Sequence, residues 1–166
     1  TFTEQINIPA ISGSSSTNTV TFNGNNSTIT FGAGTNSDPH TIRLAGADYF
    51  RFSDLNITAT GTTYALAVHL WNQSDYNIFD SCTIHVPATG LSTNIRGIVL
   101  SADSTSSASS SSFPTCDNNM FSNLTIDGGY SGYFEIASNA DNSEGNQIVF
   151  STITNNRTYG IFTERT

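Results

Sequence analysis

The stretch YNIFDSCTIHV, residues 76–86, decides the fold because the chain repeats it. Related phrases read YFRFSDLNIT at 49–58, NNMFSNLTID at 118–127 and NQIVFSTIT at 146–154. An isoleucine near the end of each phrase, with one more upstream, recurs at separations of 28, 27, 42 and 27 residues: Ile29, Ile57, Ile84, Ile126 and Ile153. The longest gap holds a Ser-rich insertion, SADSTSSASSSSFPT at 101–115, so the common period is close to 27 residues.

A second apolar phrase lies between the repeats of the first. It reads TIRLAG at 41–46, AVHLWN at 67–72, GIVLSA at 97–102, YFEIAS at 133–138 and YGIFTE at 159–164. Each unit therefore holds several short strands separated by turn residues, and no long window shows the apolar period of a helix. Such a repeat predicts an all-β chain in which each unit forms one coil of a parallel β-helix, or β-solenoid, with coils about 4.8 Å apart. We expect about five to six coils over residues 1–166.

Strand alternation predicts which side chains stack inside the coils. Three inward columns are expected: Phe52/Phe79/Phe121/Ile148, Leu55/Cys82/Leu124/Ser151 and the isoleucines above. A fourth column holds Asn77, Asn119 and Asn146 with Phe50 above them, which predicts an asparagine ladder that hydrogen-bonds from coil to coil. Cys82 is then a small core residue, and whether it pairs with Cys116 stays open.

The composition limits the choice of partners. The chain has 166 residues, which fits a single domain, a formal charge of −8 and no lysine. Nucleic acid and anionic membrane surfaces would be repelled, and no apolar run is long enough to insert into a membrane. The Asn-, Ser- and Thr-rich surface suggests an extracellular protein. Both ends read as strands without a capping helix, so we expect a fragment of a longer chain in which further coils or domains follow.

The phrases of the form N-x-(I/M/F)-x-(D/N)-x-x-I, with the intervening GIVL and YGIF strands, resemble the right-handed parallel β-helix of pectin-lyase-like proteins. FTEQINIPAISGSSSTNTVTF at 2–22 and LAGADYFRFSDLNITATGTTY at 44–64 are similar to repeat segments of large secreted, cell-surface proteins of Bacteroidetes-type bacteria. The resemblance implies right-handed winding, a cell-surface location and a role in an adhesin, a filament or a carbohydrate-active enzyme. It also makes Ser104, in an Asp-Ser-Thr triplet, a candidate for O-glycosylation, although chance is the favoured explanation of such a triplet in a Ser-rich loop.

An enzyme of this fold would need converging carboxylates with basic residues nearby. The polysaccharide-hydrolase patterns of the resemblance, Asn-Thr-Asp, Asp-Asp, Gly-His-Gly and Arg-Ile-Lys, are absent from the sequence. Arg51 and Arg96 are the candidate bases of a lyase, but Arg51 is expected to face outward between two phenylalanines. Asp54 and Asp80 lie at a turn, where we expect each to cap its own backbone. We therefore predict no catalytic residue.

The histidines do not suggest a metal site. We expect His69 and His85 to face solvent as isolated residues, and a metal would need a second ligand close by. The loop ADNSEGN at 140–146 does not have the spacing of a calcium loop and is expected to connect two coils. No metal or cofactor is predicted.

Three functions remain open. We favour a structural or adhesive module that binds carbohydrate or neighbouring surface proteins, with the aromatic residues Trp71, Tyr76, Tyr130 and Tyr133 facing outward to stack on sugar rings. The first alternative is a fragment of a polysaccharide-active enzyme. The second is an ice-binding solenoid, because the outward neighbours of the isoleucine column read TIT, NIT, TIH, TID and TIT in successive coils.

Overall fold

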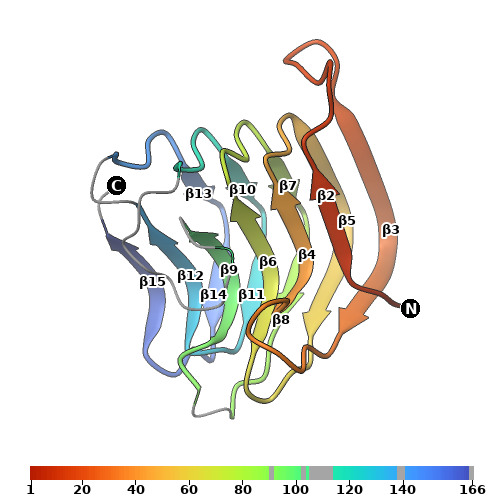
Figure 1. Ribbon diagram of the computed structural model, residues 1–166. Helices are drawn as coiled ribbons and strands as arrows, with labels where there is room; N and C mark the ends of the chain where they lie inside the picture. The colour runs from red at the N-terminus through yellow and green to blue at the C-terminus, as the bar shows by residue number, and fades with distance from the viewer. Residues whose placement is uncertain (90–91, 102–103, 105–113, 138–140, 165–166) are drawn as a thin grey trace.

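The structure, a computed structural model, describes residues 1–89, 92–101, 104, 114–137 and 141–164. Within these residues the regular elements are all strands (Figure 1): β1 (Phe2–Thr3), β2 (Ile6–Pro9), β3 (Val20–Phe31), β4 (His40–Ala45), β5 (Phe50–Ala59), β6 (Ala65–Trp71), β7 (Ile78–Asp80), β8 (Thr83–His85), β9 (Ile95–Ser101), β10 (Met120–Ser122), β11 (Thr125–Asp127), β12 (Ser131–Ile136), β13 (Gln147–Val149), β14 (Thr152–Thr154) and β15 (Tyr159–Glu164). The prediction of an all-β chain is confirmed.

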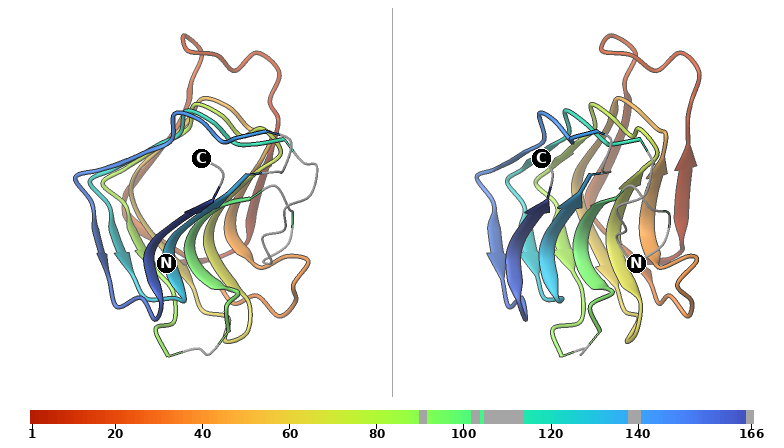
Figure 2. Two further views of the ribbon diagram at one scale, coloured as in Figure 1. Left: turned by 90° about the vertical axis from the view of Figure 1, so that its left-hand side faces the viewer. Right: turned by 60° about the vertical axis from the view of Figure 1, so that its left-hand side comes forward.

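The strands form two parallel sheets that wind around one axis. Sheet A runs β13-β10-β7-β5-β8-β11-β14, with β3 paired to β5 and β1 to β3, and sheet B runs β15-β12-β9-β6-β4-β2. Equivalent strands of successive units lie side by side in both views of Figure 2. The chain is therefore a parallel β-solenoid of about five turns, as the repeat predicts.

From β5 onward, sheet A bends at one residue in each coil. Asp54, Ser81, Asn123 and Phe150 occupy this position, and their φ angles of 53°, 54°, 54° and 51° lie in the left-handed region. β5 passes through its bend as one strand, whereas each of the next three coils is divided there into two strands. Side chains on either side of the bend keep their columns because every coil bends at the same place.

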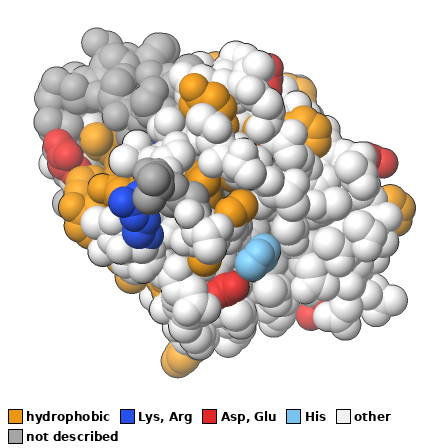
Figure 3. Space-filling model, turned by 90° about the horizontal axis from the view of Figure 1, so that it is seen from below, with side chains coloured by type: hydrophobic (Ala, Val, Ile, Leu, Met, Phe, Trp, Pro, Cys, Tyr) orange, Lys and Arg blue, Asp and Glu red, His pale blue; other side chains and the backbone are white. Residues whose placement is uncertain are grey.

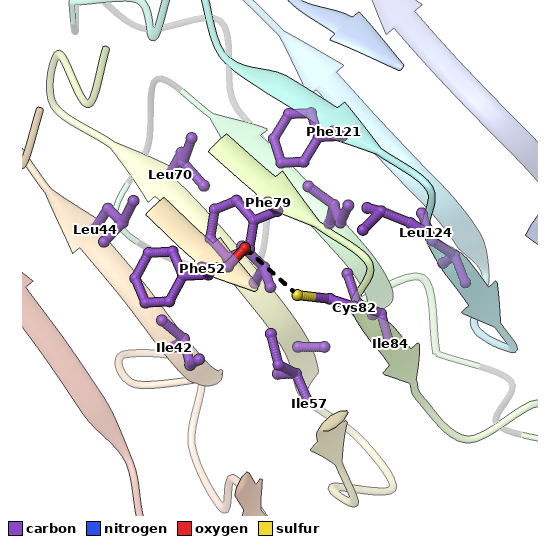
Figure 4. Packing of buried hydrophobic residues seen from close by; sticks show 14 of the residues in the cluster. Ile42, Leu44, Phe52, Ile57, Leu70, Phe79, Cys82, Ile84, Phe121 and Leu124 are labelled. Carbon is purple, nitrogen blue, oxygen red and sulfur yellow. Dashed lines mark hydrogen bonds between the residues drawn. The ribbon is translucent and has the colours of Figure 1, made fainter. Parts of the chain in front are cut away.

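The predicted inward columns are confirmed. The register aligns Phe52, Phe79, Phe121 and Ile148, and it aligns the five isoleucines in the same way. The ring centroids of Phe52 and Phe79 are 4.6 Å apart, and those of Phe79 and Phe121 are 5.7 Å apart. Figure 4 shows these rings beside the aliphatic side chains that sheet B contributes to the core, among them Leu44 and Leu70.

Both cysteines are buried and free. Cys82 lies in the core, where its Sγ is 3.3 Å from the carbonyl oxygen of Asp80 and faces that of Phe52 (Figure 4). Burial raises the pKa of the Cys82 thiol to about 11 and raises the pKa of Cys116 further still. These thiols are core residues, and the alternative of a disulfide bridge is not realised.

The asparagine ladder is confirmed. The Oδ1 of Asn77 accepts the backbone N–H of Phe50 at 2.9 Å. The Oδ1 of Asn119 accepts the backbone N–H and the Nδ2 of Asn77 at 2.9 and 3.1 Å. The Oδ1 of Asn146 accepts the same two groups of Asn119 at 2.8 and 3.1 Å. In each of these coils, one asparagine side chain thus accepts a buried backbone N–H group that has no partner in the strand pairing.

The order of side chains in sheet B differs from the expectation by one residue near its C-terminal end. β12 pairs Phe134 with Val99, and Glu135 with Leu100. An alignment of the phrases GIVLSA at 97–102 and YFEIAS at 133–138 from their first residues would instead set Glu135 opposite Val99. A column of small residues, including Gly97 and Gly132, points inward beside Ile98 and Tyr133, which also lie in the core. A Cβ at Gly97 would meet Ile126, and one at Gly132 would meet Ile153. Simple alternation is therefore broken at this point.

The expectation that His69 faces solvent is wrong. His69 has no exposed surface, although its strand position does point away from the coil interior. The outer face of sheet B carries a second apolar cluster of Leu66, Val99 and Phe134, with Ile136 and Phe162 packed against it. His69 lies in register with Val99 and is buried there.

Candidate carbohydrate-binding groove

The four aromatic residues predicted to bind glycans do not form one surface. Tyr133 is only 2% exposed and its hydroxyl donates to Glu135 at 2.7 Å, so the prediction that it faces outward is wrong. Trp71 is half-buried beneath the guanidinium of Arg43, which lies 5.7 Å from the ring centroid. Tyr130 is half-buried and packs edge-on against another tyrosine on sheet B. Tyr76 is 48% exposed and belongs to a different surface.

Tyr76 is stacked on Tyr49 of the preceding coil. Their ring centroids are 5.0 Å apart and the planes differ by 2°. Both residues occupy the same turn position, with φ angles of 57° and 61° in the left-handed region. Sequence analysis missed Tyr49. The signal was available, because Tyr49 and Tyr76 occupy the same position of two aligned phrases, directly before Phe50 and Asn77.

Two ladders hold this tyrosine pair in place. The residues that follow the two tyrosines, Phe50 and Asn77, are joined by the first hydrogen bond of the asparagine ladder. The residue before each tyrosine belongs to an acidic column, in which each carboxylate accepts the backbone N–H of the next member at 2.8 Å: Asp48, Asp75, Asp117 and Glu144. The pair is therefore fixed before any ligand arrives, so a ligand would lose little free energy in ordering it.

Burial raises the pKa of Asp75 to about 6, and the neighbouring carboxylates of Asp48 and Asp117 act in the same direction. The backbone N–H of Asp117, which donates to Asp75, acts against this shift. The corner of the coil beside the tyrosines is acidic because the carboxylates of successive coils are stacked there.

The tyrosine column becomes narrower after Tyr76. The next two positions are Asn118 and Gly145, which also have left-handed φ angles, 56° and 70°. From coil to coil, the side chain at this position becomes smaller: a phenol ring is followed by an amide and then by a hydrogen atom. The ring face of Tyr76 that Tyr49 does not cover therefore borders a hollow. This groove has a volume of about 300 Å³ and is lined by both tyrosines and by Ser16, Arg51, Ile78, Asn118, Asn119, Met120, Gly145 and Gln147.

The floor of the groove is an outward column of sheet A. Arg51, Ile78, Met120 and Gln147 lie in register there. Arg51 is exposed, which confirms the expectation for this residue. The same column borders a second hollow of about 310 Å³ that contains Asp80 and Ser122. Arg51, Ile78 and Met120 line both hollows, so the two form one continuous surface.

Asp80 does not follow the expectation that it caps its own backbone. Its carboxylate accepts from the hydroxyl of Ser122, from Nδ2 of Asn123 at 2.8 Å and from the hydroxyl of Ser81 at 3.1 Å. The bonds from Ser122 and Asn123 lower the pKa of Asp80. The side chain is thus an ionised acceptor on the outer face of sheet A.

The other residues singled out by sequence lie away from this groove. Arg96 is buried with its guanidinium 3.7 Å from the Phe134 ring centroid, and burial lowers its pKa to about 10. His85 is exposed as expected, but it is not isolated, because its Nδ1 lies 3.0 Å from the carboxylate of Asp127. Ser104 is half-exposed, and the rest of its predicted glycosylation triplet, residues 103 and 105, lies outside the described residues.

The groove combines features that suit a sugar. An aromatic face can stack on the C–H face of a pyranose ring, and amide, hydroxyl and carboxylate groups nearby can bond its hydroxyls. The face of the molecule seen from below in Figure 3 is mostly neutral, and a histidine side chain lies beside an acidic one there. Among the described residues, no group of three or more His, Cys, Asp or Glu side chains is placed to hold a metal ion.

In the described ranges, no helix has the length and apolar character needed to cross a membrane. Comparison of the chain with protein-family models, with curated proteins and with solved structures gave no match. The resemblance to pectin-lyase-like and bacterial surface proteins therefore stays a prediction.

Proposed function

We propose that this chain is an adhesive, non-catalytic module of a secreted bacterial surface protein, and that it binds carbohydrate in the groove beside Tyr76. The observation that carries the proposal is the parallel Tyr49–Tyr76 stack, with one ring face open to a groove lined by amides. Two rings already stacked on each other present the outer one in a single orientation. A sugar ring placed on Tyr76 would extend this stack by one member.

The surroundings of the ring support a polar ligand rather than a protein helix or lipid. Asn118 and Gln147 offer amide donors and acceptors beside the aromatic face. Ile78 and Met120 give the floor a narrow apolar strip, on which the C–H groups of a second sugar unit can pack. Aromatic stacking contributes about 0.5–1.5 kcal/mol beyond the apolar area it buries, so a single platform predicts a weak site that multiple copies would reinforce.

Affinity electrophoresis tests the proposal directly. The chain should be retarded in gels that contain mannan, xylan or alginate, and Tyr76→Ala should abolish the retardation. Tyr159→Ala is the matched control, because Tyr159 is 40% exposed but lies on sheet B. Equal retardation of the wild-type chain and Tyr76→Ala in every gel would refute the groove.

The enzymatic alternative assigns Arg51 and Asp80 to catalysis, because both border one hollow. It predicts the release of shortened or unsaturated oligosaccharides from alginate and other polyuronates, and the loss of that release in Arg51→Gln. We favour binding because the Asp80 carboxylate is held ionised by three hydrogen bonds and has no proton to give at neutral pH.

The ice-binding alternative rests on the threonine-rich rows, which the register does align. The exposed His85–Asp127 pair occupies the middle of this array, and Asp127 also accepts from Asn155 at 2.6 Å. A flat row of hydroxyls and methyls is interrupted there, so we do not favour this function. It would require thermal hysteresis that Thr125→Leu reduces.

A further inference from the structure

Arg51 is an exposed cation on an acidic protein. Its side chain projects from the outer face of β5, in register with Thr21 on one side and Ile78 on the other. The ion pairs formed within the described residues are Arg43–Asp38 and His85–Asp127, and neither involves Arg51. The whole chain has a net charge of −8 and only five basic residues. Arg51 is one of them, and no carboxylate in the described part of the chain forms an ion pair with it.

The position of Arg51 relates it to the tyrosine pair. Arg51 borders the hollow that contains Tyr76 and the hollow that contains Asp80. A ligand that stacks on Tyr76 and extends along the floor of sheet A therefore passes beside the guanidinium. Guanidinium groups bind carboxylate and sulfate oxygens through two parallel N–H···O bonds, which a neutral hydroxyl cannot match.

The carboxylates around the groove limit where a negatively charged group of such a ligand can bind. The acidic column that includes Asp75 lies one residue before the tyrosine position in each turn, and its members do not line the first hollow. Asp80 borders only the second hollow. An anionic substituent is repelled from both places, whereas sugar hydroxyls can donate to either. The favourable place for an anion is therefore the stretch of the first hollow beside Arg51.

We propose that the groove selects an anionic glycan, with one sugar ring stacked on Tyr76 and a carboxylate or sulfate group bound by Arg51. This inference rests on the proposed function and adds to it the class of ligand. A charge-assisted, bidentate contact of this kind corresponds to a preference of roughly tenfold for the charged glycan over its neutral counterpart.

Matched polysaccharides separate charge from shape. Binding of the chain to alginate is compared by biolayer interferometry with binding to propylene glycol alginate, in which esters replace the carboxylates. Dextran sulfate is compared with dextran in the same way. The wild-type chain should prefer the charged member of at least one pair about tenfold. A preference in the first pair alone identifies a carboxylate, and one in the second pair alone identifies a sulfate.

Three variants make the result decisive. Arg51→Gln should remove the preference, so that the charged member binds no more tightly than the neutral one. Arg51→Lys should keep a smaller preference because the charge remains without the planar fork. Tyr76→Ala should weaken binding to both members. Because Arg51 is exposed, Arg51→Gln should melt with the wild-type chain, and the melting temperature of each variant is measured first. A preference that survives in Arg51→Gln, or equal wild-type binding to both members, overturns this inference and leaves the proposed function standing. No binding to any polysaccharide would overturn both.

Discussion

The Oδ1 of Asn119 accepts two hydrogen bonds from Asn77 of the preceding coil, from the backbone N–H at 2.9 Å and from Nδ2 at 3.1 Å. Asn119 also donates from its own Nδ2 to the carbonyl of Ser74 at 3.0 Å. These groups are buried, so no water replaces a lost partner. A single amide thus joins two coils at the turn that carries the tyrosine pair.

Replacing this amide should be costly. Asn119→Ala leaves the N–H of Asn77 and the carbonyl of Ser74 without this partner, at about 1–3 kcal/mol for each buried group. We expect the free energy of unfolding, measured in urea, to fall by about 3–5 kcal/mol. Thr83→Ala, at an exposed outward position of β8, should change it by less than about 0.5 kcal/mol. Similar losses in the two variants would contradict the ladder.

The buried Tyr133–Glu135 contact predicts a second effect on stability. The Glu135 carboxylate also accepts from Ser143 at 2.6 Å and from Nδ2 of Asn146 at 2.7 Å, so it terminates the ladder. Tyr133→Phe removes one donor to a buried carboxylate, which should cost about 1.5–3 kcal/mol in the same unfolding assay. Tyr159→Phe, on the neighbouring coil, is expected to be nearly neutral. If Tyr133→Phe left the free energy of unfolding unchanged, the hydrogen bond from Tyr133 to Glu135 would be contradicted.

Asp75 predicts a dependence of stability on pH. Its pKa is raised to about 6 in the folded chain from an ordinary value of 3.8, so between these pH values the folded state binds more protons than the unfolded state. The free energy of unfolding therefore decreases as pH rises through this window, and the contribution is complete only below about pH 4. Asp75→Asn keeps an oxygen that can accept from Asp117 and removes the buried charge.

We expect Asp75→Asn to be more stable than the wild-type chain at pH 7 and equal to it at pH 4. Because Asp75 is partly exposed, solvent screening reduces the gain to about 1 kcal/mol, or roughly 2–4 °C in melting temperature. The control is Asp54→Asn, which makes the same change of net charge at the bend of sheet A. Melting is followed by circular dichroism. If Asp75→Asn raised the melting temperature equally at pH 4 and pH 7, the gain would not come from removing the buried charge of Asp75.

The shape of the tyrosine column predicts a substitution that closes the groove. Asn118 already has the left-handed φ angle at which Tyr49 and Tyr76 are accommodated. Asn118→Tyr should therefore fold and place a third ring over the free face of Tyr76. We expect it to melt within a few degrees of the wild-type chain and to lose retardation in glycan-containing gels. Undiminished binding in a folded Asn118→Tyr variant would argue that the ring face is not used.

Much of the fold was predictable because one period organises the chain. The aligned phrases place Phe79 over Phe121 and Asn77 over Asn119, and a solenoid whose coils share one register must keep such columns. Cys82 could be assigned to the core for the same reason, since leucines flank it in the alignment.

The errors arise where local geometry departs from the repeat. Gly132 lets the chain turn two successive side chains inward, so Tyr133 enters the core instead of facing solvent. His69 points outward as expected, but the outer face of sheet B is apolar, and only the three-dimensional packing reveals that it is buried.

The groove was only half visible in the sequence. The sequence indicates Tyr76 as a single outward aromatic residue, whereas its partner Tyr49 stands at the same place of the aligned phrase at 49–58. The acidic column at Asp48, Asp75 and Asp117 was also aligned one position earlier. That Arg51 borders the same hollow as Tyr76 depends on how strand and turn are joined, which a linear pattern does not give.

The central claim is that a sugar ring stacks on the open face of Tyr76. Saturation-transfer difference NMR with a mannuronate oligosaccharide measures this contact, because saturation of the aromatic protons passes to the sugar protons nearest the ring. Transfer to the C–H protons of one sugar unit should be strong with the wild-type chain and with Tyr159→Ala, and absent with Tyr76→Ala. Transfer that persists unchanged in a folded Tyr76→Ala variant would contradict the claim.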